Sequence, residues 1–305
     1  MSKPEMLLVT GASGQLGRLV LDALVRSGEQ RVIATTRKPE TLADYAQKGV
    51  QVRAADFNEP ESLVEAFSGA TVMLLISTHE VGARVKPHLA AIEAAKKAGV
   101  RHIVYTSHSE CETSVSAVAP EHAVTEKAIR ESGLKYTLLR HFLYAEMLLE
   151  ILAGSLQSGT IYGASGDGKI AFVTRRDLAD ADAGTLIHAK AHENATYDLT
   201  GPRSYSYTEL ARILSDILGR QMTYVNLAPE DYKAALLRQG MPEKTADAFL
   251  TFERSTLLGE LDRVTDMVQK LAGHAPETLE NFLRHNLFSG DKTATMDFLM
   301  KGFKA

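Results

Sequence analysis

The chain has 305 residues, 45% of them hydrophobic, which is enough for the core of one large domain or two modest ones. Its net charge of −4 and lack of a dense Lys or Arg run argue against nucleic-acid binding, and no uncharged apolar run reaches membrane-spanning length. Cys111 is the only cysteine and so cannot form an internal disulfide. The first apolar run begins close to Met1, so we expect no signal peptide and a cytoplasmic protein.

The first predicted elements are a strand, a tight turn and a helix. The strand Leu7-Leu8-Val9 leads to three glycines, and apolar residues then recur at helical spacing: Leu16, Leu19, Val20, Ala23 and Leu24. Gly11 can take the backbone angles of a sharp turn, and Gly14 lets N–H groups approach a pyrophosphate. Gly17 lets the helix pack close to the strand, which places phosphates at its positive end. The alternative is an ordinary glycine-rich loop. The position of the glycines near the N-terminus, directly between a strand and an amphipathic helix, favours dinucleotide binding.

Strands and helices then alternate to residue 141, joined by short connections. We predict strands at residues 31–36, 50–55, 71–76, 101–106 and 136–139, and helices ending near residue 48 and spanning 60–67, 85–98 and 120–131. The run 71–76 is continuously apolar, as in a strand that is buried on both faces. This alternation predicts a Rossmann-type α/β fold for residues 1–141, with a doubly wound parallel sheet covered by helices.

From residue 142 the pattern changes and helices dominate. We predict helices at residues 143–156, 176–188, 207–218, 229–239, 242–258, 276–286 and, at the end, 293–301, with short strands at 170–173, 197–199 and 222–226. Residues 142–305 are thus expected to form a smaller, mostly helical substrate-binding part, interleaved with the sheet edge. It would supply the far wall of the crevice outside the carboxyl ends of the strands.

The residues at the end of the second strand indicate which dinucleotide binds. An acidic residue is typical there when the cofactor is NAD, but this chain has Arg37 and Lys38. A guanidinium can bind a 2′-phosphate bidentately, which favours NADP(H) over NAD(H), although both residues could instead be solvated turn residues. Asp56 can accept a hydrogen bond from an adenine amino group or cap the helix that begins near Pro60.

These motifs together resemble the NmrA-like atypical short-chain dehydrogenases/reductases over nearly the whole chain, to about Leu287. The resemblance is carried by Val9-Thr10-Gly11-Ala12-Ser13-Gly14-Gln15-Leu16-Gly17, by Arg37, and by His102-Ile103-Val104-Tyr105-Thr106-Ser107. Glu121-His122-Ala123-Val124-Thr125-Glu126-Lys127 and Tyr136-Thr137-Leu138-Leu139-Arg140 are similar to the following helix and strand. Within the family, the chain resembles bacterial NADPH-dependent quinone oxidoreductases and triphenylmethane-dye reductases.

The resemblance implies a set of cofactor-binding residues. Gly11, Ser13, Gly14, Gln15, Leu16 and Gly17 would surround the pyrophosphate, with Arg37 and Lys38 at the 2′-phosphate. The rest of the dinucleotide would lie against Asp56, Phe57, Ser77, Thr78, Thr106 and Ser107, and the stretch from Arg140 through Phe142 to Tyr144 would line the nicotinamide and the substrate pocket.

A proton-donating pair typical of the wider superfamily, Tyr-x-x-x-Lys, is missing. None of the ten tyrosines has a Lys four residues later, and the corresponding helix offers His122 and Glu126. A reductase of ordinary ketones must protonate an alkoxide, so the loss argues against that chemistry. A quinone yields a resonance-stabilised anion that water can protonate, and a cationic triarylmethane dye needs no proton. Both fit catalysis by proximity and orientation.

Histidines near the predicted strand ends are the candidate catalytic groups. His141 lies beside the expected nicotinamide wall, His122 can titrate near neutral pH, and Ser107 lacks the Gly-x-Ser-x-Gly surroundings of a hydrolase nucleophile. The alternatives are a polar first-turn residue for His122 and surface-loop positions for His79 and His108. The candidate substrate-binding residues are His79, His108, Tyr144 and Met147. With Phe142, the last two would form a lid over a flat acceptor or belong to the core.

Other chemistries have weaker support. We predict no metal site: His188 and His192 share an expected helix face, but nothing completes a ligand set. Cys111 stands among polar loop residues and is expected to be idle. Asp180 and Asp182 are expected to be exposed helix charges.

The sequence therefore predicts an NADPH-dependent oxidoreductase that transfers hydride to a quinone-like, conjugated or triarylmethane-type acceptor. The rival hypothesis is an NADP(H)-binding redox sensor without turnover, and a third is a reductase of one specific natural product. We expect a small aromatic or quinone-like substrate and no direct contact with nucleic acid or membrane, and assembly as a homodimer stays open.

Overall fold

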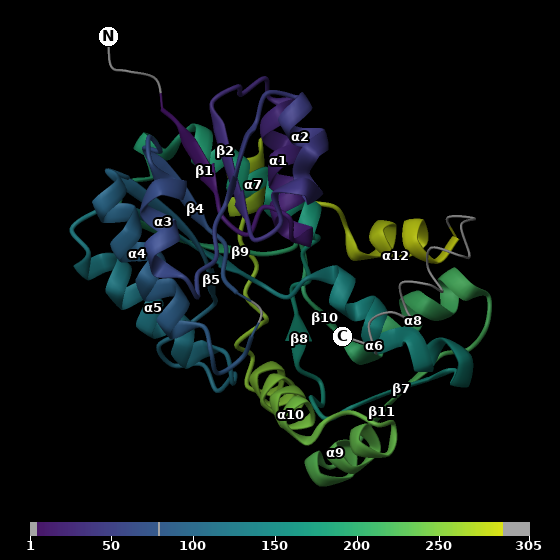
Figure 1. Cartoon of the computed structure of the whole chain (residues 1–305). Coiled ribbons are helices and arrows are strands. Elements are labelled where there is room, and N and C mark those ends of the chain that lie inside the picture. The colour runs from purple at the N-terminus through teal and green to yellow at the C-terminus, as the bar shows by residue number, and fades with distance from the viewer. Residues whose placement is uncertain (1–4, 79, 289–305) are drawn as a thin grey trace.

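A seven-stranded parallel sheet forms the centre of the molecule (Figure 1). The computed structural model describes residues 5–78 and 80–288. The strand order is β3-β2-β1-β4-β5-β6-β9, and every neighbouring pair is parallel. The strands are β1 (Leu7–Val9), β2 (Val32–Thr36), β3 (Gln51–Ala54), β4 (Val72–Leu75), β5 (His102–His108), β6 (Lys135–His141) and β9 (Ala195–Leu199). The order reverses between β1 and β4, where doubly wound sheets bind their ligands.

Helices cover both faces of this sheet, because side chains that alternate along each strand point to opposite sides. Leu7 and Val9 pack with α1 (Gln15–Arg26), α2 (Ala43–Gln47) and α7 (Arg175–Ile187). Leu8 packs on the other face with α3 (Pro60–Phe67), α4 (Val85–Ala98) and α5 (Ala119–Glu131), as Figure 1 shows. A short 3-10 turn, Pro39–Leu42, leads into α2. The predicted doubly wound α/β fold is confirmed.

Most of the remaining elements lie beyond the carboxyl edge of the sheet, below and to the right of it in Figure 1, whereas the helix Met267–Ala272 packs against α7 beside the sheet. The remaining elements are α6 (Ala145–Ser158), β7 (Thr160–Gly163), β8 (Lys169–Ile170), β10 (Tyr205–Ser206), α8 (Tyr207–Leu218), β11 (Thr223–Asn226), α9 (Pro229–Arg238), α10 (Glu243–Leu257), α11 (Met267–Ala272) and α12 (Leu279–Phe288). β11 pairs with β7 in parallel, and β10 pairs with β8 antiparallel. Ala164, Tyr232, Leu236 and Ala246 form a small separate core here.

Some elements differ from the sequence prediction. β7, β10 and α11 were not predicted, and the predicted strand 170–173 is shortened to β8. β9 is the seventh strand of the central sheet and α7 covers one of its faces, so residues after 141 complete the sheet and its cover of helices. The predicted helix at 293–301 lies outside the described residues.

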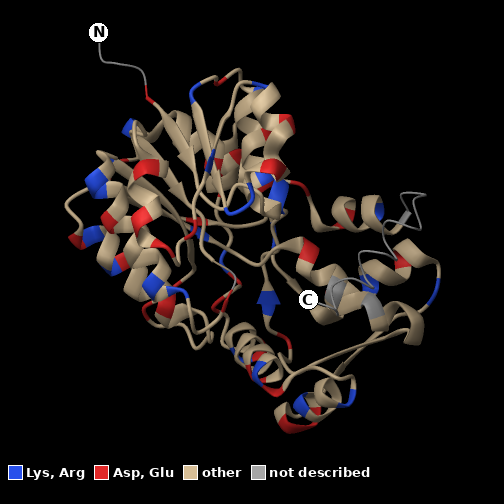
Figure 2. Ribbon diagram, viewed as in Figure 1, with Lys and Arg blue, Asp and Glu red and all other residues tan. Residues whose placement is uncertain are grey.

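The surface carries charges of both signs. Figure 2 shows Lys and Arg interspersed with Asp and Glu along the helices of the visible face. Among the helices in the described parts of the chain, each is too short or too polar to span a bilayer.

Candidate functional site

The glycine turn after β1 has the geometry that dinucleotide binding requires. Gly11 has a φ of +59°, in the left-handed region that favours glycine. Its carbonyl accepts the Gly14 N–H at 3.0 Å, which closes the turn. A Cβ on Gly17 would lie 2.5 Å from the Gly11 oxygen and 2.7 Å from the Ala12 Cα, so only glycine lets α1 approach the strand this closely. The turn therefore positions the start of α1 directly at the carboxyl edge.

The N-terminus of α1 is suited to an anion. Its N-cap residue is Gly14, which offers no side chain to the first-turn N–H groups, and the first turn contains no acidic residue. By contrast, Thr174 caps α7 and Ser206 caps α8 through side-chain oxygens. The uncapped N–H groups and the positive helix end favour a phosphate group at this position.

Basic side chains stand where the adenosine half of a dinucleotide would lie. Arg37 and Lys38 are exposed directly after β2. The Ser13 and Thr36 hydroxyls are 2.7 Å apart, so the glycine turn is joined to the end of β2. Arg18, which the sequence analysis did not single out, donates from Nε to the Ser13 carbonyl at 3.3 Å. Arg18 thus lies at the glycine turn, and Arg37 and Lys38 follow the strand end that is joined to this turn.

Asp56 and Phe57 follow β3 at the same edge. Asp56 Oδ1 accepts the Asn58 N–H at 2.9 Å, which stabilises the turn after the strand. The helix cap proposed for Asp56 is wrong, because the N-cap residue of α3 is Glu59. Phe57 is partly buried against the core on the α3 side of the sheet. Their adenine-binding role stays a prediction.

Threonine hydroxyls hold the ends of β1, β4 and β5 together. Thr10 Oγ1 donates to the Leu74 carbonyl at 3.0 Å and accepts the Ile76 N–H at 3.1 Å. Thr106 Oγ1 accepts the Ser77 N–H at 2.9 Å. Because these bonds cross the point where the strand order reverses, they fix the floor on which the ribose and nicotinamide are predicted to lie.

A buried histidine pair lies under this floor. Burial lowers the pKa of His88 to about 4, so its neutral ring accepts the Thr78 N–H at Nε2 and donates from Nδ1 to the Thr125 hydroxyl. His122 is buried as well, and its pKa lies well below the ordinary range because of burial and the neighbouring His108 and Arg84.

The contacts of His122 argue against its predicted role as an acid. Arg84 donates from Nη1 to His122 Nε2 at 3.1 Å, so the ring proton is on Nδ1, 2.8 Å from the Tyr105 hydroxyl. The ring is neutral and both nitrogens are occupied. The alternative, a polar residue on the first turn of a helix, fits its place as the fourth residue of α5, although the side chain is only 5% exposed.

Ser107 belongs to a second buried cluster, centred on Glu126. The Ser107 hydroxyl donates to Glu126 Oε1 at 2.6 Å, and Arg140 donates to both carboxylate oxygens at 2.9 and 2.8 Å. Arg130 adds a further bond at 2.9 Å. Hydrogen bonds to Glu126 raise the pKa of Arg140. The side chains of Ser107 and Arg140, both predicted site residues, are thus bound to the Glu126 carboxylate. Their roles in cofactor binding and catalysis stay predictions.

Cys111 lies beside the same cluster. Cys111 lies in the polar loop between β5 and α5, as expected, but its side chain is only 3% exposed. Three possible metal ligands lie here, the Cys111 sulfur and one carboxylate oxygen from each of Glu112 and Glu126. These three atoms are within 4.8 Å of one another. However, the Arg140 guanidinium already bonds both carboxylates, so a cation occupies the position that a metal would need.

We expect the Cys111 thiol to resist alkylation in the folded protein. Burial raises its pKa to about 12, with Glu126 adding to the effect, so the thiol stays protonated at pH 8. Iodoacetamide labelling followed by mass spectrometry checks this, with the urea-unfolded chain as the reactive control. Labelling of the folded protein as fast as the unfolded chain would contradict the assignment.

A third cluster forms where β6 ends. His141 Nε2 lies 2.9 Å from Asp182 Oδ1, and His141 Nδ1 lies 3.4 Å from the Tyr144 hydroxyl. The expectation that Asp182 is an exposed charge is wrong, because α7 buries it completely against the sheet. Leu178 and Leu186, which lie about one turn to either side of Asp182, are both buried. An acidic residue within such an apolar stripe was the sequence feature that indicated its burial.

The predicted substrate residues are divided between the core and the surface. Phe142 is 3% exposed and packs in the main core, so it is not part of a lid, whereas Met147 is 36% exposed. Tyr144 is partly buried, with Arg175 4.9 Å from the centre of its ring. His108 lies 5.9 Å from the His122 ring, and burial lowers its pKa. His79 lies outside the described residues.

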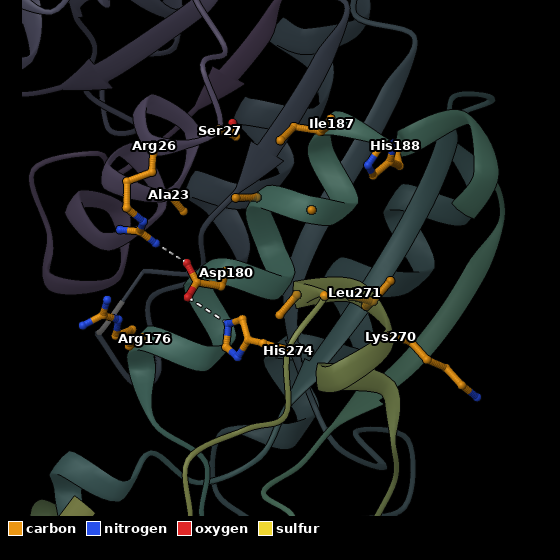
Figure 3. Close-up of a pocket in the computed structure, with 14 residues that line it drawn as sticks. Ala23, Arg26, Ser27, Arg176, Asp180, Ile187, His188, Lys270, Leu271 and His274 are labelled. Carbon is orange, nitrogen blue, oxygen red and sulfur yellow. Dashed lines mark hydrogen bonds and ion pairs between the residues drawn. The ribbon is translucent and has the colours of Figure 1, made fainter.

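An open pocket of about 750 Å³ lies elsewhere, between α1, α7 and α11 (Figure 3). Asp180 stands in it between Arg26 and His274, with which it forms ion pairs, so this aspartate is not a free exposed charge either. The helix face predicted to hold His188 and His192 does not exist, because α7 ends at Ile187 and a 3-10 turn follows. The pocket shares no residue with the predicted site.

Comparisons with known proteins agree with this architecture. Residues 3–283 match the model of the NmrA-like family. Quinone oxidoreductase 2 of Escherichia coli (strain K12) is 39% identical over 281 residues, which cover 92% of this chain and 98% of the relative.

Two solved structures are similar over nearly the same range. An NADPH-dependent quinone oxidoreductase from Escherichia coli, complexed with NADPH, has a TM-score of 0.89 at 38% identity and covers 92% of this chain and 100% of its own. The triphenylmethane reductase of Citrobacter sp., complexed with NADP(H), has a TM-score of 0.86 at 36% identity, covering 92% of this chain and 99% of its own. With the fold, the glycine turn and the family match in agreement, the chain belongs to the NmrA-like family.

Proposed function

We propose that the chain is an NADPH-dependent oxidoreductase that reduces quinone-like or extended conjugated acceptors. The observation that carries this proposal is the uncapped N-terminus of α1 behind a turn that only glycine can form, with Arg37 and Lys38 beside it. When bound, NADPH supplies the hydride. The relatives that match nearly the whole chain are named as a quinone oxidoreductase and a triphenylmethane reductase, which supports the reaction type.

The residues of the site explain why conjugated acceptors suit this chain. Thr10 and Thr106 brace the strand ends, so the floor under the nicotinamide is rigid and presents one fixed geometry to the acceptor. The chain has no Tyr-x-x-x-Lys pair, and the buried His122 is neutral. Holding a flat acceptor against the nicotinamide supplies most of the rate enhancement in such a site.

The cofactor preference follows from charge. Arg37 and Lys38 are exposed, and within residues 5–78 and 80–288 no carboxylate forms an ion pair with either. Both side chains are therefore free to bind a 2′-phosphate, which NAD lacks. We accordingly propose that NADPH binds more tightly than NADH.

The test is the oxidation of NADPH by the purified protein, followed by absorbance, with simple quinones, a cationic triarylmethane dye and ordinary ketones as acceptors. We expect turnover of quinone and dye, little with ketones and little with NADH. Tight NADPH binding without oxidation by any acceptor would overturn the proposal and support an NADP(H)-binding redox sensor instead.

A further inference from the structure

Three polar side chains form a continuous line from the interior to the carboxyl edge. Asp182 comes from α7, His141 is the last residue of β6, and Tyr144 is the N-cap residue of α6. The contacts are 2.9 Å from Asp182 Oδ1 to His141 Nε2 and 3.4 Å from His141 Nδ1 to the Tyr144 hydroxyl. Asp182 is 0% exposed, His141 is 7% exposed and Tyr144 is only partly buried. Tyr144 is therefore the most exposed member of this line.

Asp182 has little else to compensate its charge. Its second oxygen, Oδ2, is buried without a hydrogen-bond partner in the described part of the chain. An ionised carboxylate in such a place requires a positive partner, and His141 is the side chain in contact that can become positive. In its protonated form His141 donates from Nε2 to Asp182 and presents the Nδ1 proton to the Tyr144 oxygen.

We propose that Tyr144 donates the proton in the reduction of quinones, that His141 restores it, and that Asp182 positions His141. This inference rests on the proposed function and assigns the proton step within it. The quinone accepts a hydride, and hence two electrons, and becomes a hydroquinone anion. The Tyr144 O–H bond breaks as the new O–H bond of the hydroquinone forms. The tyrosinate then takes the Nδ1 proton of the His141 imidazolium, and the imidazole regains a proton from solvent.

The surroundings of Tyr144 suit this exchange. Burial raises the pKa of the phenol, and Asp182 and Glu146 add to this, so a tyrosinate is short-lived, whereas Arg175 and Arg84 oppose the shift and favour release of the proton. The Arg175 guanidinium lies 4.9 Å from the ring centre, near enough to stabilise a transient tyrosinate.

Other hydroxyls near the strand ends are less suited to donate. Tyr105 is 0% exposed and its hydroxyl accepts the His122 Nδ1 proton inside the protein. The Ser107 hydroxyl donates to Glu126. Each would have to break a buried hydrogen bond to reach a substrate, whereas Tyr144 lies at the edge with its relay behind it.

The test compares acceptors that differ in their need for a proton. A quinone needs hydride and proton, whereas a cationic triarylmethane dye needs hydride alone. We expect Tyr144→Phe to lower the ratio of quinone to dye turnover by about 10²-fold, the lower range for general acid catalysis. The solvent deuterium isotope effect on quinone reduction should disappear in this variant. Tyr162→Phe, at a tyrosine that is 48% exposed on β7, is the matched control.

Asp182→Asn tests the positioning role without removing the phenol. We expect the same ratio to fall, by less than in Tyr144→Phe, with KM for NADPH unchanged, which a merely structural defect would not produce. If Tyr144→Phe does not fold, the turnover ratio of Asp182→Asn still tests the proton relay. If the wild-type protein reduces quinones but not the dye, the solvent isotope effect on quinone reduction replaces the quinone-to-dye ratio as the quantity compared.

Each contrary outcome has a distinct meaning. Quinone reduction by Tyr144→Phe at the wild-type rate and with the wild-type isotope effect would overturn the relay and leave the proposed function intact. An equal loss with quinone and dye would show that Tyr144 shapes the site without donating a proton, and would overturn the relay too. No acceptor reduction by the wild-type protein would overturn the proposed function and the relay together.

Discussion

Gly17→Ala is expected to remove cofactor binding and to destabilise the fold, although alanine is the better helix former. The new Cβ would lie 2.5 Å from the Gly11 oxygen and 2.7 Å from the Ala12 Cα, and both are backbone atoms that cannot rotate away. Either α1 or the glycine turn must shift, at a cost of about 1–3 kcal/mol. The shift also displaces the first-turn N–H groups of α1, which we propose bind the pyrophosphate. Urea unfolding and fluorescence titration with NADPH measure the two effects separately.

Gly154→Ala is the matched control, since it places the same side chain in another helix. No atom lies within 4 Å of a Cβ at Gly154 in α6, and its φ is not in the left-handed region. We therefore expect this variant to gain about 0.5–1 kcal/mol of stability and to bind NADPH normally. If Gly17→Ala unfolded at the wild-type urea concentration and bound NADPH with unchanged affinity, the close approach of α1 would have no functional importance.

The central sheet was predictable because its signals are local. The strand at β4 is a continuous apolar run, and α4 ends at Gly99 in the left-handed conformation, as the sequence predicted. β8 and β10 have two residues each, and they pair with each other across 35 positions of the chain. Nothing in so short a segment distinguishes a strand from a loop, because its partner decides the structure. β10 was missed for that reason, and β8 was given wrong bounds.

The polar interior of the site was much harder to predict than its glycine turn. Gly11 and Gly17 are required by backbone geometry, which a sequence motif records directly. Asp180 and Asp182 look alike in the sequence, yet one forms surface ion pairs and the other is fully buried against His141. The difference arises from the packing of α7, in which Asp182 contacts β6 of the sheet and Asp180 contacts Arg26 of the neighbouring α1. In a helix of mostly small residues, Leu178 and Leu186 are only a weak local signal for the side that will be covered.

Arg37→Ala is expected to weaken NADPH binding by about 10- to 100-fold and to leave NADH binding unchanged. The reason is the loss of a charged hydrogen bond to the 2′-phosphate, which contributes about 1.5–3 kcal/mol, whereas NADH has no group at that position. Arg37 is exposed, and in the parts of the chain that the structure describes it forms no ion pair, so its removal should not alter the fold. Titrations with both dinucleotides at one ionic strength give the ratio of dissociation constants.

Arg212→Ala separates this specific effect from a general loss of positive charge. Arg212 is exposed on α8, which packs outside the central sheet. Its removal changes the net charge by the same amount, so NADPH and NADH should bind to this variant as they do to the wild-type protein. An equal weakening in both variants would mean that long-range attraction, which high salt would screen, accounts for the preference. A weakening confined to Arg37→Ala that persists at high salt would instead require a direct contact with the 2′-phosphate, and Lys38→Ala would then show whether the second cation shares it.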